Sequence, residues 1–164
     1  AQEARKLTSA FEPIILRESL GAFIQPAPTK KVKASFTLGA GAQEVITDGG
    51  YVVADDPDTE QLEIKKLQSF NEIGAEFDAH ASGDIDEHLG WNVALNILYP
   101  FVTTADTELE GTELINTEFS GKLSARLTKW ASVDYVFTAR KVPLVLDEWQ
   151  VQNNLLLSAS FSVL

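Results

Sequence analysis

Apolar and polar residues alternate along most of this chain. In residues 88–101 every second position is apolar, and the positions between are mostly polar or small. The apolar positions of this segment are Leu89, Trp91, Val93, Leu95, Ile97, Tyr99 and Phe101. Successive side chains of a β-strand point to opposite faces of a sheet, whereas a helix would mix the two sets around its circumference. The segment is therefore predicted to be a strand.

The same alternation recurs in six other parts of the chain, and no part shows a convincing helical period. These six parts are residues 16–25, 32–43, 72–81, 115–127, 131–140 and 150–163. The sequence therefore predicts an all-β protein with about seven strands.

The predicted strands are joined by connections of alternating length. The short ones are residues 26–30, 82–86 and 128–130, and the longer ones are residues 47–68, 103–112 and 142–148. Short turns at one rim and long loops at the other are typical of an antiparallel up-and-down β-barrel, including barrels that span membranes. We expect a barrel domain over residues 14–164, preceded by an irregular lead-in over residues 1–13.

The polar rows of the strands suggest a barrel interior. They hold mainly Ser, Thr, Gly, Asn and Gln with some charges of both signs, whereas a water-facing sheet is usually richer in charge. Unpaired buried charge is costly, so we favour a lumen that is plugged by paired charges over an open ion path. The residues predicted to form this lumen charge network are Arg17, Lys33, Glu72, Glu76, Asp78, His80, Glu118, Lys122, Arg126, Asp134 and Arg140.

The apolar row of residues 89–101 is long enough to cross a bilayer. Thirteen residues extend about 43 Å at ~3.3 Å per residue, or roughly 33 Å of height in a tilted strand. Trp91 lies near one end of the row and Tyr99 near the other, as in the aromatic girdles of membrane barrels. We therefore expect Leu89, Trp91, Val93, Leu95, Ile97, Tyr99 and Phe101 to face lipid, which makes the barrel transmembrane.

Composition removes several functional classes. The 164 residues include 13 Lys and Arg against 24 Asp and Glu, a net charge of −11, which argues against nucleic acid as a partner. The absence of Cys excludes disulfides, thiolate metal sites and a cysteine nucleophile, and two His residues are too few for a His-rich metal site. We therefore expect neither a metal nor a cofactor.

Three segments resemble bacterial outer-membrane proteins. Residues 155–164 resemble the closing strand of outer-membrane barrels, although the chain ends on Leu164 with its nearest aromatic at Phe161. Residues 16–21 and 127–135 resemble parts of outer-membrane barrel families of unknown function. The resemblance implies an outer-membrane location, contact with membrane lipid or lipopolysaccharide and with the barrel-assembly machinery, and a structural or pore-type envelope role without catalysis.

Two alternative functions follow from other features. Glu76, Asp78, His80 and Ser82 share one face of a predicted strand and resemble the Ser–His arrangement of outer-membrane lipid A deacylases. Positions i and i+2 of a strand are about 6.6 Å apart, too far for a direct His80–Ser82 hydrogen bond, so no catalytic site is predicted. The other alternative is a soluble β-barrel that binds a ligand.

The predicted number of strands raises the question of closure. Single-chain bacterial barrels have an even number of strands and both termini on the periplasmic side. Seven strands satisfy neither condition. We therefore expect this chain to be the C-terminal portion of a larger barrel, completed by another chain or by another segment of the same protein.

Overall fold

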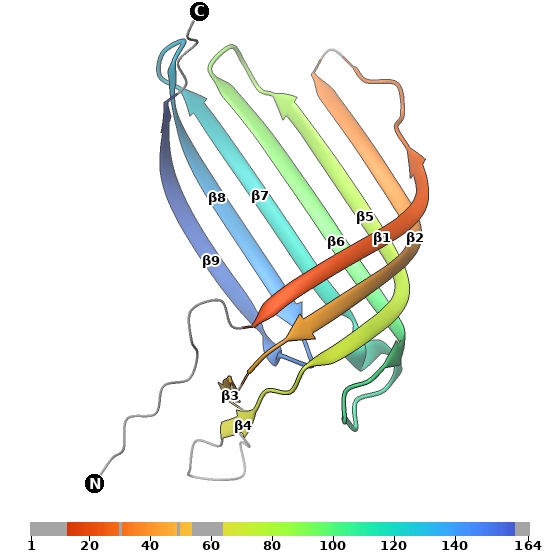
Figure 1. The fold of residues 1–164 in the computed structure, drawn as a ribbon. Coiled ribbons are helices and arrows are strands. Elements are labelled where there is room, and N and C mark those ends of the chain that lie inside the picture. Colours follow the sequence, from red (N-terminus) through yellow and green to blue (C-terminus); the bar gives the residue numbers. More distant parts are fainter. Residues whose placement is uncertain (1–12, 30, 49, 54–63, 160–164) are drawn as a thin grey trace, which may run out of the picture.

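The computed structural model describes residues 13–29, 31–48, 50–53 and 64–159, and these residues form nine strands and one short 3₁₀ helix (Figure 1). Seven strands form one sheet in the order β1-β2-β5-β6-β7-β8-β9, and every neighbouring pair is antiparallel. The strands of this sheet are β1 (Ile14–Ile24), β2 (Val32–Ile46), β5 (Phe70–Asp84), β6 (Leu89–Thr103), β7 (Asn116–Arg126), β8 (Ala131–Val142) and β9 (Leu146–Ala159). The prediction of an all-β, antiparallel, up-and-down sheet is confirmed.

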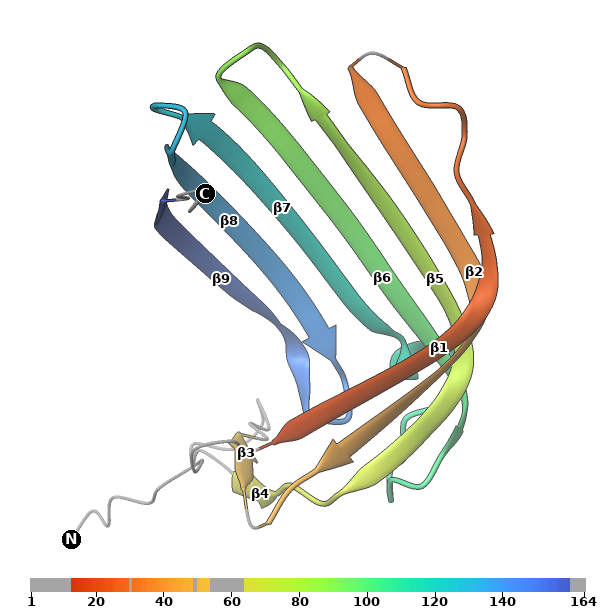
Figure 2. The ribbon, with the colours of Figure 1, turned by 45° about the horizontal axis from the view of Figure 1, so that its top comes forward.

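The sheet is strongly curved but it does not close. β1 pairs with β2 and β9 pairs with β8, and no pairing joins β1 to β9 among the described residues. Figures 1 and 2 show β1 wrapping toward the far end of the sheet, on the other side of the concavity from β6 and β7. No helix in the described part of the chain is long and apolar enough to cross a membrane.

Two connections differ from the expectation. Within the loop expected at residues 47–68, β3 (Tyr51–Val53) and β4 (Ile64–Lys66) form a small antiparallel hairpin. The connection at residues 142–148, which the sequence predicts to be long, is a tight turn, because β8 continues to Val142 and β9 begins at Leu146. The backbone N–H of Val145 donates to the carbonyl of Val142 at 2.9 Å, which closes this turn. The prediction of a long loop here was wrong because both strands extend into residues in which the apolar–polar alternation is lost.

Several side chains of the polar rows are more deeply buried than those of the apolar rows. Gln43 is 1% exposed, and Glu72 and Asn116 are 0% exposed. The apolar row on the other side is exposed, with Ile73 at 55% and Leu157 at 76%. Side chains of the polar row form hydrogen bonds between strands that are not neighbours, so this row lines the concave side.

The apolar core is small and lies at one end of the sheet. The buried apolar residues are Val45, Leu67, Phe70, Leu98, Leu114 and Val142. They come from the end of β2, the start of β5 and the residues just before it, the second half of β6, the 3₁₀ helix η1 (Gly111–Leu114) and the end of β8. All of these places adjoin the rim that carries the longest connections. The buried apolar side chains are therefore concentrated toward that rim.

A pair of glycines lets β1 approach β2 closely. Gly21 and Gly39 face each other in the register. A Cβ at Gly39 would lie 2.2 Å from the carbonyl oxygen of Leu20 and 2.4 Å from the Cα of Gly21. Because both atoms belong to the backbone, β1 would have to move away from β2.

Gly39→Ala is accordingly expected to destabilise the protein by about 1–3 kcal/mol. Gly121→Ala is the matched control in another strand, since a Cβ there meets only Phe119 Cε1 at 3.9 Å. Denaturant unfolding of both variants measures the effect. Equal midpoints for the two variants would show that the close approach of β1 and β2 is not required.

Candidate functional site

Asn96 is the centre of a polar network on the concave side. Its Oδ1 accepts a hydrogen bond from Arg17 Nη1 at 2.7 Å, and its Nδ2 donates to Glu76 Oε1 and to Asp78 Oδ1, both at 2.7 Å. Arg17 lies on β1 and Asn96 on β6, with β2 and β5 between them in the sheet. The Arg17–Asn96 bond therefore spans the concavity.

Glu72 anchors the buried end of the same network. Its Oε2 accepts hydrogen bonds from Gln43 Nε2 at 3.0 Å and from Asn116 Nδ2 at 2.8 Å. Gln43 Oε1 in turn accepts from Arg17 Nε at 2.7 Å. Glu72 Oε1 and Asn116 Oδ1 are buried without a hydrogen-bond partner.

A second cluster surrounds Asp134 on β8. The carboxylate accepts hydrogen bonds from the hydroxyls of Ser124 and Ser158, on the two neighbouring strands, and Lys122 Nζ lies 3.1 Å from its Oδ2. The side chain of Asp134 is 5% exposed and that of Lys122 is 45% exposed. The cluster thus neutralises a buried carboxylate and ties β7, β8 and β9 together.

The rim with the short turns carries further polar contacts. Arg126 Nη2 on β7 lies 2.6 Å from Asp84 Oδ1 at the end of β5, so this ion pair also crosses a strand. In the turn between β5 and β6, Asp86 Oδ1 accepts the backbone N–H of His88 at 2.7 Å and that of Leu89 at 2.8 Å. These two hydrogen bonds lower the pKa of Asp86. These hydrogen bonds therefore stabilise the turn fully at pH values above the usual pKa of an aspartate. The stabilisation is lost as the pH falls through the lowered pKa of Asp86.

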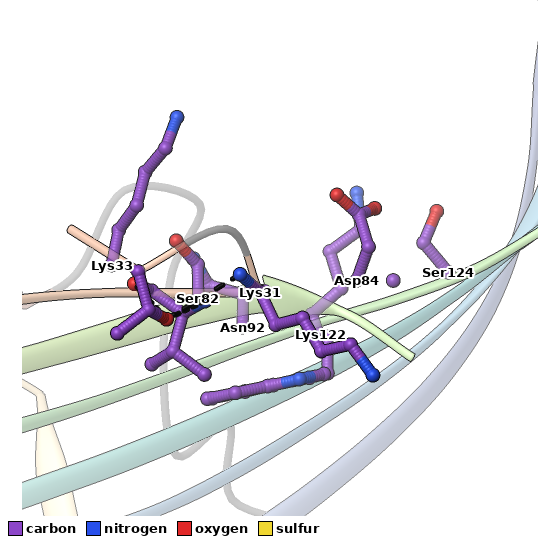
Figure 3. Close-up of a pocket in the computed structure, with 12 residues that line it drawn as sticks. Lys31, Lys33, Ser82, Asp84, Asn92, Lys122 and Ser124 are labelled. Carbon is purple, nitrogen blue, oxygen red and sulfur yellow. Dashed lines mark hydrogen bonds between the residues drawn. The ribbon is translucent and has the colours of Figure 1, made fainter. Parts of the chain in front are cut away.

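Among the described residues, two of the cavities along the sheet are lined by residues of the predicted lumen network. The larger, of about 520 Å³, is at the short-turn rim between the ends of β2, β5, β6 and β7. In Figure 3 Lys33, Ser82, Asp84, Lys122 and Ser124 line it. The smaller, of about 330 Å³, is lined by residues of β7, β8 and β9 that include Glu118, Thr138 and Arg140. Both are open hollows, and charged side chains of both signs line each of them.

The eleven residues predicted to form the lumen network are distributed over these features. Arg17, Glu72, Glu76 and Asp78 share one network, and Lys122 pairs with Asp134. The other five lie outside these two clusters. His80 contacts Asn92, Arg126 pairs with Asp84, and Arg140 Nη2 donates to Gln150. Lys33 lines the larger cavity and Glu118 the smaller one.

Sequence reasoning missed the amides that organise the site. Gln43, Asn96 and Asn116 hold the carboxylates, so direct pairing of opposite charges is the exception in the described network. Their place in the polar rows was visible in the alternation, but their roles depend on contacts between distant strands. The register also settles one neighbour that the alternation leaves open: Arg126 faces Ser132, and Asp134 faces Ser124.

The structure does not assemble the Ser–His pair of the hydrolase alternative. His80 Nε2 lies 2.6 Å from Asn92 Nδ2, and no hydrogen bond joins His80 to Ser82 in the described part of the chain. Among the described residues no group of three or more His, Cys, Asp or Glu is placed to hold a metal ion. No protein-family model, curated protein or solved structure matches the chain.

Glu72 provides a test of the network. Glu72→Ala leaves the amides of Gln43 and Asn116 without their buried acceptor, which costs about 1–3 kcal/mol for each donor. Glu72→Gln retains an acceptor oxygen and is expected to lose less. Glu44→Ala, which removes an exposed carboxylate on the neighbouring strand, is the control. Denaturant unfolding should show the largest loss for Glu72→Ala, a smaller one for Glu72→Gln and the smallest for Glu44→Ala. Equal losses of stability in the three variants would contradict the role of Glu72.

Proposed function

We propose that this chain forms the wall of a transmembrane β-barrel in a bacterial outer membrane. The observation that carries this proposal is the reversed burial: the concave side buries Gln43, Glu72 and Asn116, while the opposite side exposes an apolar surface. Water would favour the opposite arrangement. A lipid bilayer favours this one, since apolar side chains then face acyl chains and polar groups satisfy one another inside.

The apolar surface is continuous across the strands. At one level of the register the residues side by side are Ile24, Phe36, Ala79, Leu95, Phe119, Ala139 and Val151. Soluble monomers rarely expose a contiguous apolar patch of more than a few hundred Å². A ladder of apolar residues that crosses all seven strands supports contact with lipid over the whole outer side.

Aromatic residues lie toward both ends of this surface. Trp91 is near the short-turn end of β6, and Tyr99 and Phe101 are near its other end, where their rings pack edge to face with centroids 5.6 Å apart. This distribution supports two interfacial girdles. The lipid-facing row of the proposal is therefore Leu89 to Phe101 in alternate positions.

The interior supports a structural role rather than a wide channel. The Glu72 and Asn96 networks cross the concavity, and the buried apolar residues lie toward its long-loop end. Gln43, Glu72 and Asn116 are at most 1% exposed, which supports a closed rather than a water-filled interior at that end. Within the proposal, the partners of the chain are outer-membrane lipid or lipopolysaccharide and the barrel-assembly machinery, and the chain needs no catalytic residue or cofactor.

Fractionation tests the location directly. In a Gram-negative host that exports the chain, the protein should sediment with outer membranes and require detergent for extraction. Recovery in the soluble fraction without detergent would refute the membrane proposal and favour the soluble ligand-binding barrel.

A pair of arginine substitutions tests which face meets lipid. Leu95 lies at the middle of β6 on the apolar side, so Leu95→Arg should cost roughly 2–4 kcal/mol on folding into bilayers. Thr138→Arg is the matched control, because Thr138 lies at a neighbouring register level and lines the smaller cavity, which has room for the longer side chain. Reversible unfolding in phospholipid vesicles measures both. A Leu95→Arg loss no larger than that of Thr138→Arg would place this face in a protein interface.

A further inference from the structure

Two oxygen atoms at the long-loop end of the interior lack a hydrogen-bond partner. They are Glu72 Oε1 and Asn116 Oδ1, and both are buried. Their side chains are already joined by one hydrogen bond, from Asn116 Nδ2 to Glu72 Oε2 at 2.8 Å. Buried polar atoms usually have a partner, and an unsatisfied one destabilises the fold. An amide oxygen and an ionised carboxylate oxygen only accept, so whatever satisfies this pair has to supply a donor.

The donors around Glu72 converge on one of its two oxygens. Oε2 accepts hydrogen bonds from Asn116 and from Gln43, whereas Oε1 has no donor among the described residues. Both oxygens of an ionised carboxylate are acceptors, but a protonated carboxyl has one acceptor oxygen and one O–H donor. The arrangement matches a protonated carboxyl whose hydroxyl is at Oε1.

The surroundings of Glu72 disfavour a negative charge. The side chain is 0% exposed, and burial disfavours the ionised form of a carboxyl. In the described part of the chain no Lys or Arg forms an ion pair with Glu72. Arg17, the cation of the network, directs its hydrogen bonds to the amide oxygens of Gln43 and Asn96 instead. A charge on Glu72 would therefore be buried without a direct counter-charge.

The neighbouring titratable groups add to this effect. In the register the uncharged Gln43 on β2 and Thr103 on β6 lie opposite Glu72. The described titratable side chains on the concave side of the strands around it are Arg17 on β1, Glu76 on β5 and Glu118 on β7. Two of these three would repel an ionised Glu72.

We infer that Glu72 is a protonated carboxylic acid in the folded protein and that its Oε1–H donates to Asn116 Oδ1. The acid and the amide then share two hydrogen bonds, one in each direction, and a single proton satisfies both orphan atoms. Glu72 lies on β5 and Asn116 on β7, with β6 between them, so the pair ties two strands that are not neighbours. Loss of the proton removes one of the two bonds and leaves a buried charge. The long-loop end of the interior is thus held closed by a proton and loosens as the pH rises.

The pH dependence of stability tests the inference. An unfolded glutamate is ionised above a pH of about 4.3, so at neutral pH the folded protein holds one proton more than the unfolded chain. Its stability then falls as the pH rises, relative to a variant that needs no proton at this position. Glu72→Gln is that variant, because its amide N–H replaces the O–H. The exposed carboxylate of Glu44 on β2 supplies the control, Glu44→Gln.

Denaturant unfolding of the full chain in detergent micelles, from about pH 5 to about pH 9, gives the comparison. The folding equilibrium constant of the wild type relative to Glu72→Gln should fall about tenfold per pH unit until Glu72 ionises in the folded protein. Glu44→Gln should keep the wild-type profile. A ratio of wild type to Glu72→Gln that stays constant or rises with pH would show that Glu72 is ionised in the fold, and would overturn the inference.

Infrared spectroscopy detects the proton on the wild-type protein itself. A protonated carboxyl has a C=O stretching band that a carboxylate lacks. At neutral pH this band is expected in the wild type and in Glu44→Gln, and it should be lost in Glu72→Gln. Its absence from the wild type, or its full persistence in Glu72→Gln, would overturn the inference even if one variant folded poorly.

The proton on Glu72 does not depend on what covers the outer side of the sheet. Both measurements can be made in detergent micelles whether fractionation finds the protein in membranes or in the soluble fraction. Failure of the membrane location would leave the Glu72 result unchanged, and an ionised Glu72 would leave the membrane location unchanged.

Discussion

The hydrogen bonds from Arg17 to Asn96 and from Asn116 to Glu72 are the constraint on which the rest of the structure depends. Both connect strands that are not neighbours, so they hold the sheet in its curved form from the inside. Curvature brings side chains of the polar rows within hydrogen-bonding distance of one another, and it buries Gln43, Glu72 and Asn116 almost completely. It also spreads the apolar rows over the outer side, which makes the outer side unsuited to water.

The carboxylates in this interior accept hydrogen bonds mostly from amides and hydroxyls. Asn96 separates Arg17 from Glu76 and Asp78, and Ser124 and Ser158 share the carboxylate of Asp134 with Lys122. These neutral donors let several carboxylates lie close together in a chain of net charge −11. They also fix the strands relative to one another, because each amide has a donor and an acceptor end.

The sequence predicted the sheet well because strand identity depends on local alternation. Every predicted strand corresponds to a strand of the sheet, and the ends that can be compared differ by a few residues. Residues 160–163 of the last predicted strand lie outside the described residues. The tight turn after Val142 and the β3–β4 hairpin were missed, because short irregular segments have no period. Of the site, alternation gave the polar rows, whereas the central role of Asn96 requires β1 and β6 to approach each other across the concavity.

The sequence by itself thus determined the strands, their order and the two chemically different faces, since a period of two is written into neighbouring residues. Only the tertiary structure decided how deeply each polar side chain is buried, which amides hold the carboxylates, and that β1 and β9 are unpaired with each other among the described residues. These properties depend on the curvature of the whole sheet. The curved sheet brings together residues far apart in the chain, 79 positions for Arg17 and Asn96, and no local pattern encodes such contacts.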